Sequence, residues 1–143
     1  MFGTITWNEK YSIGIEEIDS QHKKLFEILN SYYKNLVDSK TIGVTNDVMK
    51  DTINNLIDYA TYHFREEEKL MNSIQGVDFS SHFRQHQDFC LKVATLKGKT
   101  FLGNDVSFEL FDFVKDWLIN HILVSDQQIG KALQINTTEN TII

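Results

Sequence analysis

Residues 63–71 read HFREEEKLM, a run in which charged residues separate a His-Phe pair from a Leu-Met pair. Four residues advance an α-helix by slightly more than one turn, so His63 and Glu67 lie on the same helical face. Glu66 and Glu68 are rotated by about 100° to either side of Glu67. We therefore expect Glu67 to point inward with His63, and its two neighbours to form a solvated, charged face.

Apolar residues recur at helical spacing in four stretches of the chain. The predicted helices cover residues 20–38, 45–71, 80–97 and 105–130. The candidate N-caps are Asp19 or Ser20, Thr45 or Asn46, Ser80 or Ser81, and Asn104 or Asp105. Four long helices joined by short loops favour an all-α fold, an antiparallel up-down-up-down four-helix bundle. The first eighteen residues, with Trp7 and Tyr11, are predicted to form an extended arm.

The composition favours a single domain over residues 1–143. The chain has 143 residues, of which 41% are hydrophobic and ten are phenylalanine, enough for a packed core. We divide it into an N-terminal arm (1–18), a bundle (about 19–131) and a C-terminal tail (132–143). An acidic surface and few exposed apolar residues favour a monomer, with weak association as the alternative.

Charge and hydropathy argue against two kinds of partner. A net charge of −6 leaves no basic stripe to replace counterions on nucleic-acid phosphates. No run approaches the roughly 18 apolar residues of a membrane span, and the N-terminus lacks the layout of a signal peptide. The single cysteine, Cys90, cannot form an internal disulfide, which fits a cytoplasmic protein. We expect Cys90 to be a small buried core residue.

All five histidines share the apolar stripes of the predicted helices. They are His22, His63, His82, His86 and His121. A single core histidine is most often a structural residue with one hydrogen-bond partner. Five imidazoles in one apolar interior would need more partners than the few inward polar groups supply. Metal coordination satisfies them together, because neutral imidazole is a common ligand of iron, copper and zinc.

Two carboxylates complete the candidate ligand set. Glu67 shares the face of His63, and Asp126 follows His121 by five residues. Five residues rotate an ideal helix by about 140°, so Asp126 reaches the same site only through a local bulge or loosened turn. Seven ligands suit two metals. If both carboxylates bridge, the five histidines divide as three and two, which leaves one open position for a small molecule.

These residues and their order resemble the hemerythrin family, particularly the single-domain bacterial bacteriohemerythrins. His-x3-Glu, His-x3-His and His-x4-Asp, in this order after an isolated Gln-His, form a specific pattern. The matching segments extend over nearly the whole chain: Trp7 in the arm, IGIEEIDSQHKKLF (13–26), HFREEEKLM (63–71), HFRQHQDF (82–89) and WLINHILVSD (117–126).

The resemblance implies a site of two non-heme iron ions, joined by an oxo or hydroxo bridge, that binds dioxygen reversibly. Matching positions assign one saturated iron to His82, His86 and His121. They assign the iron with the open position to His22 and His63, and the bridging roles to Glu67 and Asp126. Leu118, three residues before His121, is expected to keep water from the open position, in an apolar lining completed by Leu25, Phe64 and Trp117.

Three classes of function remain open. A carrier or store of dioxygen is favoured; a sensor of oxygen or redox state would need a separate partner protein. A di-iron enzyme that reduces peroxide or nitric oxide would need an electron-donor site, and the sequence offers none that is recognisable. The chain has no Glu-x2-His motif, which disfavours a ferritin-like oxidase. Binding is therefore favoured over turnover.

Overall fold

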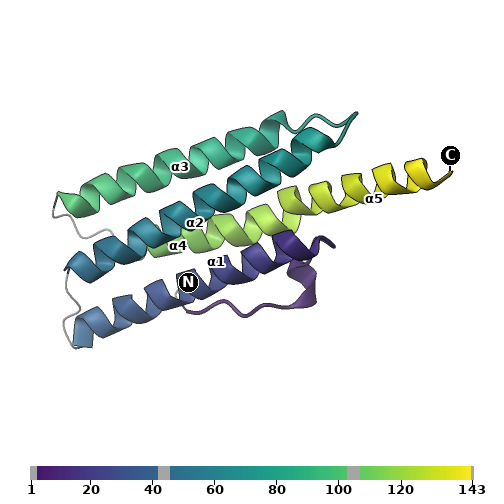
Figure 1. Ribbon diagram of the computed structural model, residues 1–143. Helices are drawn as coiled ribbons and strands as arrows, with labels where there is room; N and C mark the ends of the chain where they lie inside the picture. The colour runs from purple at the N-terminus through teal and green to yellow at the C-terminus, as the bar shows by residue number, and fades with distance from the viewer. Residues whose placement is uncertain (1–2, 42–45, 103–106, 143) are drawn as a thin grey trace.

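The predicted all-α four-helix bundle is confirmed by a computed structural model (Figure 1). It describes the backbone of residues 3–41, 46–102 and 107–142, and the side chains of 3–38, 50–102 and 108–135. The α-helices are α1 (Glu16–Thr41), α2 (Asn46–Ser73), α3 (Ser80–Phe101), α4 (Ser107–His121) and α5 (Gln127–Ile142). A 3-10 helix, η1 (Glu9–Tyr11), precedes α1, and a π-helical turn, η2 (Ile122–Asp126), joins α4 to α5. Successive long helices run in opposite directions, with α4, η2 and α5 forming one continuous rod (Figure 1).

The predicted start of the first helix was too late. Asp19 was a candidate N-cap, but its N–H already donates to the carbonyl of Ile15 (2.9 Å) inside the first turn of α1. Its carboxylate instead accepts hydrogen bonds from Ser12 and Ile13 in the arm. Sequence patterns do not distinguish a carboxylate that caps its own helix from one that holds the preceding segment.

Among the other helix starts, that of the third was predicted correctly, since α3 begins at Ser80. Asn46 and Ser80 are the first residues of α2 and α3 rather than caps, and Phe79 precedes α3 without a side-chain cap hydrogen bond. The candidates Thr45, Asn104 and Asp105 lie outside the described residues.

The C-terminal boundaries needed larger corrections. The third helix continues to Phe101 instead of ending near residue 97, and residues 132–142 continue α5 rather than forming a separate tail. In Figure 1 the end of α5 projects beyond the other helices. The fourth predicted stretch ended at Gly130, which is buried within α5.

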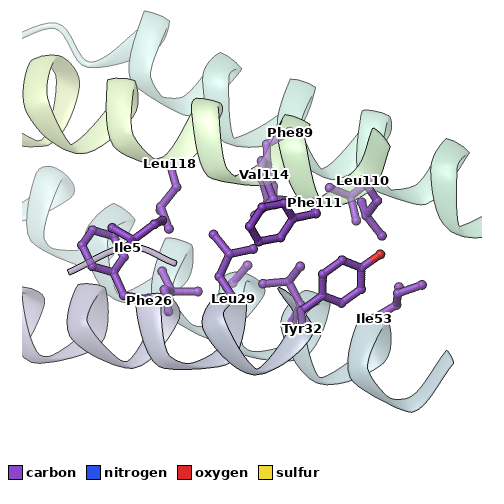
Figure 2. Close-up of a cluster of buried hydrophobic side chains, with 14 of the residues drawn as sticks. Ile5, Phe26, Leu29, Tyr32, Ile53, Phe89, Leu110, Phe111, Val114 and Leu118 are labelled. Atoms are coloured by element: carbon purple, nitrogen blue, oxygen red, sulfur yellow. The ribbon is translucent and has the colours of Figure 1, made fainter. Parts of the chain in front are cut away.

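Two clusters of apolar side chains form the core, and Figure 2 shows part of the larger one. The larger cluster contains Phe64 on α2, Phe89 on α3 and Ile122 in η2. The smaller cluster is formed by Met71, Ile74, Phe79, Ile129 and Ala132. Along the sequence, candidate ligands lie between a residue of one cluster and a residue of the other. Residue 67 lies between Phe64 and Met71, residues 82 and 86 lie between Phe79 and Phe89, and residue 126 lies between Ile122 and Ile129. The bundle therefore holds its polar residues between two apolar regions.

The N-terminal arm packs along α1. The amide of Ile5 donates to Asn30 Oδ1 (2.8 Å), and Asn30 Nδ2 donates back to the carbonyl of Ile5 (2.9 Å). The Trp7 and Tyr11 rings pack against Phe26, at centroid distances of 5.8 and 5.2 Å. These contacts make the arm part of the core.

Two further expectations concern individual residues and the membrane. Cys90 is exposed on α3 and is not a core residue; it follows the buried Phe89 by one residue, which turns it about 100° away from the core stripe. Among the helices that the structure describes, none combines the length and hydropathy needed to cross a bilayer.

Candidate metal centre

All seven candidate ligands are buried, and none is more than 4% exposed. They come from every side of the bundle: His22 from α1, His63 and Glu67 from α2, His82 and His86 from α3, His121 from α4 and Asp126 from η2. Each helix places its histidine inward because the histidine shares the apolar stripe that forms the core. The structure therefore brings together the whole set that the sequence singled out.

Asp126 is approached by imidazoles from three helices. Its Oδ2 lies 2.9 Å from His22 Nε2. Its Oδ1 lies 3.0 Å from His82 Nε2 and 3.1 Å from His121 Nε2. Asp126 is thus in contact with histidines of α1, α3 and α4 at once.

Glu67 occupies the matching position on α2. Its Oε1 lies 2.8 Å from His63 Nε2 and 3.6 Å from His86 Nε2. Its Oε2 lies 3.9 Å from His82 Nε2. The i,i+4 spacing of His63 and Glu67 therefore produces the shared inward face that the sequence predicted.

The donor atoms fall into two groups, within each of which all atoms lie within 4.8 Å of one another. The first group is Glu67, His82, His86, His121 and Asp126. The second is His22, His63, Glu67 and Asp126. Both carboxylates belong to both groups, whereas each histidine belongs to one. This is the arrangement that two neighbouring metal ions bridged by two carboxylates would require.

Many of these buried atoms lack a hydrogen bond of acceptable geometry within the described part of the chain. They are both ring nitrogens of His22 and His82, Nε2 of His63, and all four carboxylate oxygens of Glu67 and Asp126. An unpaired buried polar group costs about 1–3 kcal/mol, so natural proteins rarely leave so many together. A cation coordinated by these atoms would satisfy them at once. The clustered residues therefore fit a metal site.

Burial lowers the pKa values of His63, His86 and His121 and so favours their neutral form, which is the form that binds metal. Desolvation, followed by the neighbouring His121 and His82, lowers the pKa of His86 to about 3. Desolvation and the nearby His22 hold the pKa of His63 well below its usual range. Conversely, burial and the adjacent Asp126 carboxylate raise the pKa of Glu67 well above its usual range. Cations between the two carboxylates would remove this mutual repulsion.

Two glutamines form hydrogen bonds with candidate histidine ligands. Gln21 Oε1 lies 2.7 Å from His63 Nδ1, and Gln85 Oε1 lies 2.8 Å from His121 Nδ1. An amide oxygen only accepts, so each Nδ1–H donates and each Nε2 keeps its lone pair for the site. Neither glutamine was predicted from the sequence, because each supports a histidine of another helix. The only available signal was that each precedes another candidate histidine in the chain.

The side chain of Glu68 was expected to be solvated, but it contacts His86. Its Oε2 lies 2.8 Å from His86 Nδ1, and its side chain is 32% exposed. The 100° rotation from Glu67 does turn Glu68 away from the site, but toward α3, where His86 lies. The sequence cannot show which side of a helix faces a neighbour, so it could not separate Glu68 from Glu66.

The contact between Glu68 and His86 leads to a prediction about residues that contact a candidate ligand but do not bind the metal themselves. Glu68→Ala should weaken metal binding about 10-fold, because changes in the partners of ligand histidines typically cost 10–100-fold in affinity. Glu66→Ala is the matched control, since the Glu66 side chain is equally exposed, at 32%, and forms an ion pair with Lys69. Competition with a graded chelator series measures both variants. Equal affinities for the two would show that the Glu68–His86 contact does not support the site.

The predicted departure from regular helix between His121 and Asp126 is confirmed. Residues 122–126 form a π-helical turn, and Asp126 at its end is fully buried. The wider turn absorbs the offset of about 140° that five residues would leave on an ideal helix. Ser125 Oγ donates to Gln85 Oε1 (2.7 Å), the same oxygen that accepts from His121. Gln85 therefore contacts the residue that precedes the π-helical turn and a residue within it.

Two of the four residues expected to line the oxygen pocket lie beside the first donor group, which contains three histidines. The ring of Phe64 stacks on His86, with centroids 4.0 Å apart, and Trp117 stacks on His121 at 4.2 Å. Phe64 also lies 5.9 Å from His63, so it adjoins both groups. Leu25 and Leu118 are buried in the larger apolar cluster. Whether these residues line an oxygen pocket stays a prediction.

Comparison with known proteins yields a consistent picture. The sequence model of the hemerythrin HHE cation binding domain matches residues 13–133. A bacteriohemerythrin of Clostridium acetobutylicum is 34% identical over 124 residues, which cover 85% of this chain and 95% of that protein. A myohemerythrin of Theromyzon tessulatum is 34% identical over 120 residues, covering 84% and 86%. A crystal structure of wild-type hemerythrin superposes with a TM-score of 0.77 at 28% identity, covering 92% of this chain and 98% of the other.

Proposed function

The chain belongs to the hemerythrin family, and on this premise we propose that it binds dioxygen reversibly at two non-heme iron ions, as a carrier or store rather than an enzyme. Family membership and the clustered donors support a metal site. Within it, we assign one iron to His82, His86 and His121. We assign the other to His22 and His63, and the bridging roles to Glu67 and Asp126.

The observation that carries this proposal is the unequal division of the donors. The first group offers three imidazoles and two carboxylates, and the second offers two imidazoles and the same two carboxylates. With a bridging oxygen added, a six-coordinate ion would be complete in the first group and one ligand short in the second. A metal that lacks one ligand can accept a small molecule.

The donor types favour binding over oxidation chemistry. Five imidazoles and only two carboxylates place little negative charge around the metals, so higher iron valences receive less stabilisation than in a carboxylate-rich site. A pair of ferrous ions would supply the open position and the electrons that reversible dioxygen binding needs. The chain's own contribution is a buried set of donors: every candidate ligand is buried, and apolar clusters adjoin the site.

A cycle of oxygenation tests the proposal. The iron-loaded protein is reduced without oxygen, exposed to air and then purged with inert gas, while its visible absorbance is recorded. We expect a charge-transfer band that appears in air and fades on purging through several cycles, with iron-free protein as the control. Continued consumption of dioxygen in the presence of a reductant would instead indicate an enzyme. A band that never reverses would contradict a carrier.

A further inference from the structure

Residues 10–13 of the arm, which we call the strap, contact the chain immediately after Asp126. Gln127 Nε2 donates to the carbonyl of Ser12 (3.0 Å) and to that of Lys10 (3.3 Å). Gln127 begins α5 directly after the π-helical turn that carries Asp126. A π-helical turn is rare and short, so external contacts matter to its position.

The strap is also fixed to α1. Asp19 accepts from Ser12 Oγ at 2.6 Å and from the amide of Ile13 at 2.9 Å. Asp19 lies three residues before His22, on the adjoining turn of the same helix. The strap thus connects the turn that precedes His22 with the residue that follows Asp126. At the site itself, His22 Nε2 and Asp126 Oδ2 are 2.9 Å apart.

Gly130 lets the strap approach α5 this closely. A Cβ atom built on Gly130 would lie 2.0 Å from the carbonyl oxygen of Ile13 and 3.0 Å from its carbonyl carbon. Those are backbone atoms, so the clash cannot be relieved by a rotamer change. Glycine is otherwise an unfavourable residue inside a helix. The close approach explains its presence in α5, where it is buried.

We propose that the strap is a positioning element of the metal centre, because it sets the separation of His22 and Asp126. The strap would thereby stabilise the metal held by the second donor group, which we call the two-histidine group because it contains His22 and His63. The inference rests on the proposed metal site. His22 and Asp126 both belong to the two-histidine group, whereas only Asp126 belongs to the other. A displaced strap should therefore weaken the two-histidine metal first.

Gly130→Ala and Gln127→Ala test the strap in two ways. The first pushes the strap away by steric clash, and the second removes its hydrogen bonds without adding bulk. Gly98→Ala is the matched control, because Gly98 lies in α3 and an added Cβ would meet nothing within 4 Å. Circular dichroism first establishes that each variant is folded.

The measurement is bound iron per chain after anaerobic loading with ferrous iron and equilibrium dialysis against graded chelator. For both strap variants, we expect one iron to leave at about 10-fold lower chelator concentration than in the wild type, as for other changes around ligands. The second iron should leave at the wild-type concentration, and Gly98→Ala should follow the wild type throughout. A purely structural role would release both irons together.

The outcomes separate this inference from the proposed function. A wild-type chain that holds two irons, with variants that keep both or lose both together, overturns the strap alone. A wild-type chain that cannot hold two irons overturns the proposed site and the strap with it. Gln127→Ala keeps the test decisive if Gly130→Ala does not fold.

Discussion

Glu67→Gln should remove both metal ions from the protein. Glu67 belongs to both donor groups and is fully buried, so its replacement by a neutral amide changes the surroundings of both metals. The amide has nearly the same shape but keeps only one oxygen to coordinate and carries no charge. Because changes to residues outside the ligand shell already cost 10–100-fold, we expect more than about a 100-fold loss of affinity. Iron per chain after dialysis measures the effect.

Two comparisons show whether this loss is specific. Glu66→Gln should leave the iron content unchanged, because Glu66 is turned about 100° from Glu67. The free energy of unfolding of metal-free Glu67→Gln should not fall below that of metal-free wild type. Burial beside Asp126 makes ionised Glu67 unfavourable in the metal-free chain, as the raised pKa of Glu67 indicates. Equal iron loss in both variants, or a metal-free variant that unfolds more easily, would count against a bridging role.

The sequence predicted the helices and the inward faces well, because both follow from one periodicity. Apolar residues at helical spacing define the stripe that must be buried, and any histidine on that stripe is carried inward with it. The same geometry predicted the π-helical turn: His121 and Asp126 could reach one site only if the helix between them widened. Helical periodicity thus predicted a departure from the regular helix.

What the sequence could not predict depends on contacts between elements. Gln21, Gln85 and Glu68 each support a histidine of a different helix, and no spacing along one helix reveals such a partner. The continuation of α5 past Gly130 has the same origin. That glycine accommodates the carbonyl of Ile13, more than a hundred residues earlier in the chain, rather than ending a helix.

The ring contacts of Phe64 and Trp117 show which side-chain contacts helical spacing can predict and which it cannot. A stripe spans roughly 100° or more of a helix, so residues on it can face different neighbours within the same core. Phe64 follows His63 directly, yet it stacks on His86 of α3. Trp117, by contrast, stacks on His121, four residues later on its own helix, as helical spacing predicts. Periodicity shows that a residue is buried, but its contacts with other helices depend on how the helices pack.

Leu118→Ala should shorten the lifetime of the oxygen-loaded protein. Leu118 is buried on α4 and lies one turn before His121. In Figure 2 it points from α4 into the space between α4 and α1, where Ile5 and Phe26 also lie. Phe26 lies one turn after His22, which we assign to the iron with the open position. Removing the Leu118 side chain would therefore open a space for water close to that iron.

Autoxidation separates this role from ordinary packing. Leu118→Ala should cost roughly 2–5 kcal/mol in the free energy of unfolding, as truncated core leucines do, and should also speed the irreversible decay of the dioxygen-dependent absorbance band. Leu36→Ala is the control: Leu36 is buried in the same cluster, but lies about 20 Å along α1 from His22. It should lose comparable stability while the band decays at the wild-type rate. If Leu36→Ala speeds the decay as much as Leu118→Ala does, general loosening of the core is the cause, and Leu118 does not protect the open position from water.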